Sequence, residues 1–243
     1  FPAPSTLYRS FERLPMSVWR SFLRDSATIC DLRSHGAIDA TFFDRESIET
    51  LQHHSDSHIR TLKTTALVDT DSCAILDFHC SGHWPHDTQT SCRVALRNTK
   101  KIESLAGDKG YDDQSLRDAL RLEGVRPLLR HRLFAAYDRA HNVRFDSELY
   151  GQHWMAETGY SAIKRRFGPV VTLNVVREFR ELVLTAAIYN LEQALNSDPH
   201  AVIGFNKAGK WGHCLMHHSR IPDRPGKNGA ASSRYLVAFA VLD

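Results

Sequence analysis

Four polar side chains of the types used in phosphate chemistry recur at regular spacing between residues 150 and 164. At about 100° per residue, as in an α-helix, His153, Glu157 and Lys164 fall on one narrow stripe close to Tyr150. An imidazole, a carboxylate, an ammonium and a phenol on one face suit the binding and cleavage of phosphate esters. An ordinary amphipathic helix with a mixed polar face has the same pattern, so the spacing alone leaves both interpretations open.

Two more acids stand where neighbouring strands would bring them together. Asp39 lies inside a β-type run, 37–43, where an apolar residue is usual, and Asp108 ends the fourth predicted strand. On adjacent strands these carboxylates would lie side by side, with Glu157 across from them. Such a group repels itself unless a cation joins it, and Mg²⁺ prefers oxygen ligands. Two ions roughly 3.5–4 Å apart could activate an attacking hydroxyl and stabilise the leaving oxygen.

The elements that would position these acids follow from the apolar periodicity and the turn residues. Two short helices are predicted within residues 1–30, separated at Pro15. The predicted strands are 37–43, 61–70, 73–80, 103–108 and 125–132. The later helices are predicted from Asp87 or Thr88 to about Lys101, and over 112–124, 150–166 and about 175–196.

Three strands followed by helix, strand, helix, strand and helix is the order of a ribonuclease H-like α/β domain, a mixed five-stranded sheet flanked by helices. We expect three parts: a short helical amino-terminal segment, 1–35; the ribonuclease H-like domain, 36–197; and a poorly structured tail, 198–243. The chain begins at Phe1, which suggests a truncated amino-terminal region.

The composition and the apolar runs indicate which partners are possible and which compartment we expect. The net charge of +3 over 243 residues permits a nucleic-acid partner. No apolar run approaches the length of a membrane span and no secretory signal is evident, so we expect a cytoplasmic protein with reduced cysteines. Two His/Cys groups are spaced loosely like zinc ligands, but neither has a second paired half: His79, Cys80, His83 and His86; and His213, Cys214, His217 and His218.

Several motifs together resemble one family, the DDE transposases of bacterial and archaeal insertion sequences in the groups related to insertion-sequence families four and five. The matching segments are IDATFFDR (38–45), LKTTALVDT (62–70), HDT (86–88), AGDKGYD (106–112), GVRPLLRHR (124–132), AHNVRFDSELYGQ (140–152) and EFRELVLTAAIYN (178–190). The family's Tyr-x2-Arg-x3-Glu-x6-Lys signature falls on Tyr150, His153, Glu157 and Lys164 with its spacing intact.

The resemblance implies a function and a set of residues that perform it. It implies a transposase that cleaves DNA at the element ends and joins the freed 3′-hydroxyl to target DNA, acting as a homodimer on double-stranded DNA that carries terminal inverted repeats. The catalytic residues, which would also bind two Mg²⁺ or Mn²⁺ ions, would be Asp39, Asp108 and Glu157. The DNA-binding residues would be Tyr150, His153 and Lys164.

Three departures from the family pattern keep a second interpretation open. His153 stands where relatives have Arg, which removes an always-charged bidentate fork for phosphate. The amino-terminal part is shorter than expected, and the tail after about Asn196 matches nothing in the family. These departures favour a degenerate remnant that only binds DNA, whereas the intact acidic triad favours an active transposase. A host nuclease of the same fold has no feature in its favour.

Overall fold

The computed structural model describes residues 3–43, 62–83, 85–144, 146–168, 170, 175–197, 202–205 and 211–214. Its centre is a mixed five-stranded sheet in the order β3-β2-β1-β4-β5, in which β2 is antiparallel to β1 and β3, while β4 and β5 are parallel to β1. The strands are β1 His35–Phe43, β2 Leu62–Asp69, β3 Ile75–Ser81, β4 Ser104–Gly107 and β5 Arg126–Leu129. The predicted ribonuclease H-like fold is therefore confirmed.

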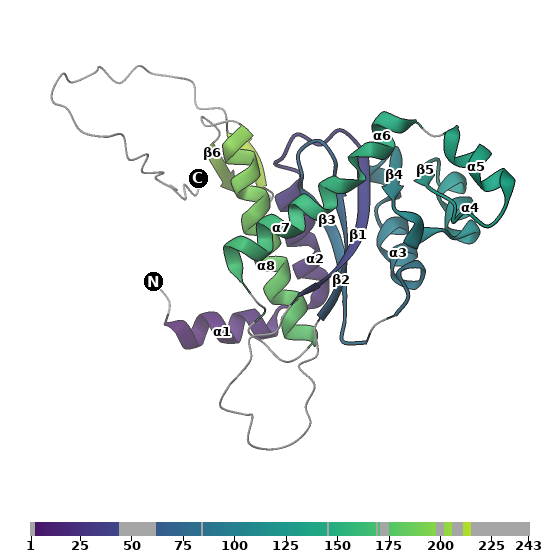
Figure 1. The fold of residues 1–243 in the computed structure, drawn as a ribbon. Coiled ribbons are helices and arrows are strands. Elements are labelled where there is room, and N and C mark those ends of the chain that lie inside the picture. The colour runs from purple at the N-terminus through teal and green to yellow at the C-terminus, as the bar shows by residue number, and fades with distance from the viewer. Residues whose placement is uncertain are drawn as a thin grey trace, which may run out of the picture.

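Helices cover both faces of this sheet (Figure 1). One layer holds α1 Pro4–Arg13, α2 Met16–Ala27, α7 Met155–Phe167 and α8 Val175–Ser197. The other layer holds α3 Asp87–Leu96 and α4 Gln114–Leu122. The remaining helical segments are η2 Thr99–Lys101, η3 Lys109–Tyr111, α5 Ala136–Val143, α6 Ser147–Gly151 and η4 Gln152–Trp154.

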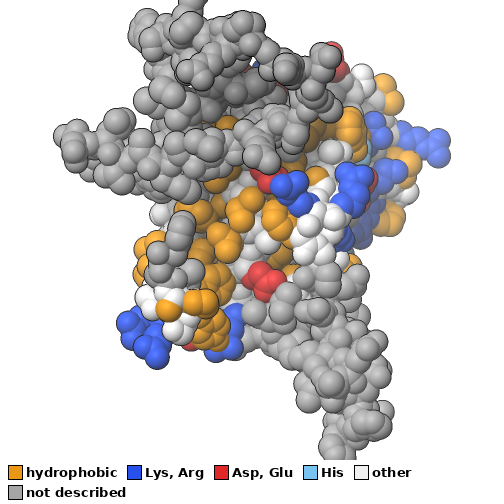
Figure 2. All heavy atoms as spheres, turned by 90° about the vertical axis from the view of Figure 1, so that its left-hand side faces the viewer, with side chains coloured by type: hydrophobic (Ala, Val, Ile, Leu, Met, Phe, Trp, Pro, Cys, Tyr) orange, Lys and Arg blue, Asp and Glu red, His pale blue; other side chains and the backbone are white. Residues whose placement is uncertain are grey.

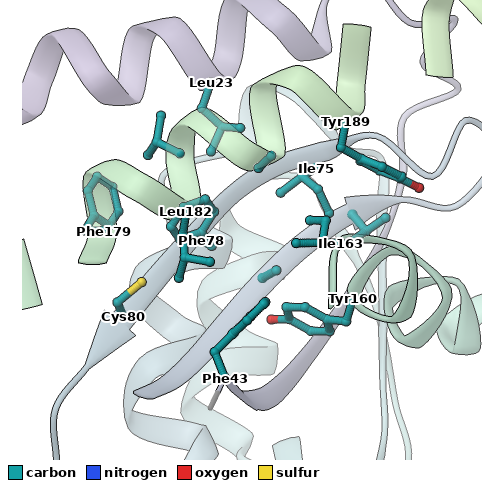
Figure 3. Packing of buried hydrophobic residues seen from close by; sticks show 14 of the residues in the cluster. Leu23, Phe43, Ile75, Phe78, Cys80, Tyr160, Ile163, Phe179, Leu182 and Tyr189 are labelled. Atoms are coloured by element: carbon teal, nitrogen blue, oxygen red, sulfur yellow. The ribbon is translucent and has the colours of Figure 1, made fainter. Parts of the chain in front are cut away.

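Alternation along the strands gives each face of the sheet its own hydrophobic core. On one face, Phe43 and Phe78 pack with side chains of α2, α7 and α8 (Figure 3). On the other face, Ile38 and Leu67 pack with side chains of α3 and α4. Successive side chains of a strand point to opposite faces, so β1 and β2 contribute to both cores and are buried from two sides.

The amino-terminal helices pack on this domain. Trp19 and Leu23 of α2 belong to the same core as α7 and α8. The fully buried Asn190 of α8 fixes the contact: its amide accepts a hydrogen bond from the Ile75 N–H and donates to the Ile75 carbonyl and to Ser26 Oγ. A side-chain amide thus pairs with the backbone of β3 as another strand would, which satisfies polar groups at the end of that strand.

Some predicted boundaries were wrong. The region predicted as one helix over 150–166 is interrupted: α6 ends at Gly151, η4 follows, and α7 begins at Met155. Gly151 is a poor helix former, and tertiary hydrogen bonds around residues 150–153 favour the tighter turn. The helix predicted to run from Asp87 or Thr88 to Lys101 is capped by His86, whose Nδ1 accepts from the Thr88 N–H, and it ends at Leu96 before η2.

Beyond α8, two short strands, β6 Val202–Phe205 and β7 Trp211–Cys214, pair in antiparallel fashion, and the other positions of the predicted tail lie outside the described residues. Among the described helices, none is both long and apolar enough to cross a bilayer. Figure 2 shows the side of the molecule on which α1 and α8 lie, and hydrophobic side chains gather there. The exposed residues Tyr8, Val176 and Leu184 belong to these two helices.

Candidate active site

Asp39 and Asp108 lie at matching positions on two parallel strands. Ile38 of β1 is the register partner of Gly107, the last residue of β4. Asp39 and Asp108 each come one residue later, so both carboxylates lie at the carboxyl end of the pairing between these strands. The juxtaposition expected from the strand order is what the register produces.

Two glycines near Asp108 lie where neighbouring side chains approach the backbone closely. A Cβ at Gly107 would meet Leu129 Cδ2 at 2.9 Å and Ile38 Cγ2 at 3.1 Å. A Cβ at Gly110 would meet the Asp108 carboxylate at 2.8 Å, because Asp108 Oδ1 accepts a 2.7 Å hydrogen bond from the Gly110 N–H. The sequence GDKG therefore lets β4 fit between its neighbours and fixes the orientation of the Asp108 carboxylate.

The third acid, Glu157, lies in the first turn of α7, where the helix dipole favours a negative charge. Tyr160, one turn later, holds this helix on the sheet: its hydroxyl lies 3.1 Å from the carbonyl oxygen of Asp39 and 3.0 Å from that of Thr64. The buried Tyr160 ring also packs edge-on against Phe43, with 6.0 Å between centroids (Figure 3). Tyr160 thus connects the helix that carries Glu157 to the backbone of the first aspartate.

Electrostatics indicates that these acids share one region. Burial raises the pKa of Asp39 to about 6, and the negative charges of Asp108, Glu157 and Asp87 contribute to the increase. Asp87, however, forms an ion pair with Lys63 at 2.8 Å. Asp39, Asp108 and Glu157 form no ion pair with any Lys, Arg or His of the described ranges.

An uncompensated group of carboxylates is the donor set that a hard divalent cation requires. In the part of the chain that the structure describes, no three His, Cys, Asp or Glu side chains converge closely enough to hold a metal ion. The same finding excludes a preformed zinc site at residues 79–86; the second His/Cys group extends outside the described residues.

Tyr150 and His153 form a stack with an arginine from another element. The Tyr150 ring is 6% exposed and lies 4.8 Å from the His153 ring, at 25° to it. The Arg130 guanidinium carbon lies 4.0 Å from the centre of the Tyr150 ring. The negative charge of Asp108 helps to raise the pKa of Tyr150, after burial, so this stack borders the acidic group.

Lys164 points to a different part of β1. Its Nζ donates a 2.7 Å hydrogen bond to Thr41 Oγ1, two residues beyond Asp39, and lies 5.3 Å from the centre of the Phe43 ring. Of the four signature positions, the structure brings Tyr150 and His153 together, while Glu157 and Lys164 lie along α7, which runs over β1.

Positive charge is concentrated in the connection between β5 and α6. Residues 130–144 contain four arginines and one aspartate, a net charge of +3 that equals that of the entire chain. None of the four arginines forms an ion pair with a described residue. Asp138 is engaged by His131 and by the backbone N–H groups of residues 134 and 135.

Sequence reasoning assigned Tyr160 only to an apolar face and did not single out Arg130. The position of Tyr160, three residues after Glu157, marked it as buried but gave no sign of a hydrogen bond to β1. The excess of arginine over 130–144 was visible in the sequence and could have directed attention to Arg130.

The fold and the acids Asp39 and Asp108 define a ribonuclease H-like domain that carries one carboxylate within β1 and one directly after β4. A family model described as the transposase DDE domain matches residues 31–191, and the chain belongs to this family. A search of curated proteins found no match. Among solved structures, the chain is similar to a chain in the cryo-EM structure of the simian T-cell lymphotropic virus intasome with PP2A regulatory subunit B56 gamma: 13% identity, a TM-score of 0.34, and coverage of 85% of this chain and 65% of that one.

Proposed function

We propose that this domain cleaves DNA at the ends of an insertion sequence and joins the freed 3′-hydroxyl to target DNA, with Asp39, Asp108 and Glu157 as its catalytic residues. The observation that carries the proposal is the register of β1 and β4, which aligns Asp39 with Asp108 while α7 holds Glu157 over the same strand. Family membership supports transposition over other reactions of this fold.

The donor set fits two Mg²⁺ or Mn²⁺ ions, which Asp39, Asp108 and Glu157 would hold. When bound, such ions activate the attacking oxygen and stabilise the leaving oxygen of the phosphodiester. The protein supplies the rest: Gly110 orients Asp108, Tyr160 positions α7, and Lys164 offers a charge for a phosphate near β1. We further propose double-stranded element ends and target DNA as the partners, and a homodimer as the active form.

The test uses DNA that flanks the coding sequence and contains the element end. With Mg²⁺ or Mn²⁺, the wild-type chain should cut at that end, and Asp108→Ala should reduce the rate by at least about 10³-fold, since it removes a ligand. Asp118→Ala is the matched control, because Asp118 lies exposed on α4 in an ion pair with Arg121. Equal cleavage by wild type and Asp108→Ala would refute the assignment of the acids.

A second candidate, a remnant that binds DNA without cleaving it, is favoured by one observation. His153 replaces the signature arginine, and its ring is engaged by Tyr150 through both stacking and a hydrogen bond. DNA binding without cleavage by the wild-type chain would support this candidate. Gain of cleavage in His153→Arg would identify the lost arginine as its cause.

A further inference from the structure

His153 is oriented in a way that prevents its neutral ring from binding a phosphate. Its Nδ1 lies 2.9 Å from the Tyr150 carbonyl oxygen. A carbonyl only accepts hydrogen bonds, so Nδ1 carries the proton, and in the neutral imidazole Nε2 then bears a lone pair. A phosphate oxygen is also an acceptor, so Nε2 of the neutral ring has no proton to offer it.

Arg130 occupies the position next to Asp108 on the neighbouring strand. Gly107 of β4 is the register partner of Leu129, the last residue of β5, so Arg130 follows β5 as Asp108 follows β4. Together with the pairing of β1 and β4, this aligns Asp39, Asp108 and Arg130 in one row across three parallel strands. A cation is thus aligned with the two aspartates.

The guanidinium of Arg130 is held in place without being neutralised. Its central carbon lies 4.0 Å from the centre of the Tyr150 ring, a cation–π contact that restrains the side chain and leaves its charge intact. Its buried Nε has no hydrogen-bond partner, and no described residue forms an ion pair with it, although Asp108 occupies the adjacent register position. A fixed and unpaired guanidinium fork matches the geometry of a phosphate group.

We infer that Arg130 binds a DNA phosphate beside the acidic group and thereby takes over the function of the signature arginine that His153 replaces. The inference rests on the proposed function, since it assumes that DNA lies across the carboxyl end of the pairing between β1 and β4. Tyr150 contacts both residues: its ring lies next to the Arg130 guanidinium and is stacked with the His153 ring. The family's charge would be retained while its position in the sequence changes.

The experiment measures binding of the full chain to a short DNA duplex in EDTA at several salt concentrations. Each phosphate contact that is lost reduces the slope of log K against log salt by about 0.9. We expect Arg130→Gln to lower the slope by about that amount, and Arg130→Gln with His153→Arg to restore it. The matched control is Arg126→Gln at the opposite end of β5, about 13 Å away, where Arg126 already faces Asp146 at 3.7 Å.

An unchanged slope in Arg130→Gln would overturn the inference, as would a double variant that stays at the lower slope. Should Arg130→Gln fail to fold, Arg130→Lys decides: it keeps the charge but loses the planar fork, so affinity should fall at constant slope, and unchanged affinity overturns the inference. Failure of the proposed function would give a different result. If the salt slope depends on Arg130 but the wild-type chain does not cleave DNA with Mg²⁺, the phosphate contact is supported and the proposed cleavage reaction is refuted.

Discussion

At the scale of single residues, the ionised carboxylate of Asp39 destabilises the metal-free folded state, because it is partly buried among other acids. Asp39 is partly buried, and three other acids contribute to the field around it. Its pKa is raised from 3.8 to about 6, so the native state binds a proton more tightly than the unfolded chain does. Stability from this group is complete below about pH 4 and is lost as the pH rises through about 6.

Replacing Asp39 with Asn should therefore stabilise the metal-free protein. At about pH 7, Asp39→Asn removes the unfavourable charge, and we expect a gain of about 1–2 kcal/mol in the free energy of unfolding, less than the full pKa shift because Asp39 retains contact with solvent. The gain should vanish below about pH 3, where the carboxyl group is protonated in both states. Urea denaturation in EDTA at the two pH values measures both effects.

Mg²⁺ should make the wild type more stable than Asp39→Asn. Added Mg²⁺ is expected to raise the melting temperature of the wild type and to leave that of Asp39→Asn nearly unchanged, because only the wild type retains all three carboxylates. Asp118→Asn controls for loss of an exposed negative charge. A destabilised Asp39→Asn at about pH 7 would contradict the account of Asp39 as an uncompensated carboxylate.

At the scale of elements, α7 depends on one hydroxyl for its position on the sheet. Tyr160→Phe removes the one hydroxyl proton that the Asp39 and Thr64 carbonyl oxygens share, and we expect a loss of about 1–2 kcal/mol of stability. The cleavage rate should fall more than DNA affinity does, since Glu157 lies one turn away on the same helix. Urea denaturation, single-turnover cleavage and DNA binding of the same preparation distinguish the two effects.

Tyr111 provides the control for this substitution. Its ring is equally buried, but its hydroxyl has no hydrogen-bond partner among the described residues. Tyr111→Phe should therefore be neutral or slightly stabilising. Equal losses of stability in Tyr160→Phe and Tyr111→Phe would show that the hydroxyl of Tyr160 is not what holds α7.

The strands and most helices could be predicted from the sequence because their signals are local. Apolar runs separated by turn residues define β2 and β3, and the glycine after α4 has a φ of +78°, as a helix-terminating position requires. The interruption at η4 could not be predicted, since a 3₁₀ turn shifts side-chain directions by only about 20° per residue relative to an α-helix. It depends on tertiary contacts such as the 2.8 Å hydrogen bond between Thr70 Oγ1 and Gln152 Oε1.

The acidic residues of the candidate site could be predicted from the sequence, whereas the residues that support them could not. Asp39 interrupts an apolar strand and Asp108 ends one, and both positions are visible in the sequence. Arg130 and Tyr160 obey the local pattern, one as a charged residue after a strand and the other as an aromatic residue on the buried side of a helix. Only the register of β4 with β5 and the docking of α7 give them a role.

At the scale of the whole molecule, Asp77 joins the two helical layers across the outer edge of the sheet. Its Oδ1 accepts from Arg20 of α2 at 3.0 Å, and its Oδ2 accepts from Arg97 and Asn98, just beyond α3, at 2.9 and 3.0 Å. Helices from the two layers thus share one buried carboxylate on β3.

Asp77→Ala should destabilise the entire domain rather than one element. Two arginines would lose their common partner, and we expect a loss of about 3 kcal/mol in urea denaturation, with a smaller loss for Asp77→Asn. Cleavage per folded molecule should be unchanged, because Asp77 lies at the β3 edge of the sheet, two strands from β1. An unchanged free energy of unfolding in Asp77→Ala would contradict the role of Asp77 as a joint between the two layers.

The parallel pairing of β1 with β4 has a consequence for how the protein is made. Asp39, Asp108 and Glu157 are far apart along the chain, and they meet only after β4 has inserted beside β1 and α7 has docked. Contacts of such high sequence separation form late in folding, because they must first overcome the entropy of closing long loops. We expect a nascent or half-folded chain to have one acid in place at most, so that the ability to cut DNA would itself report that folding is complete.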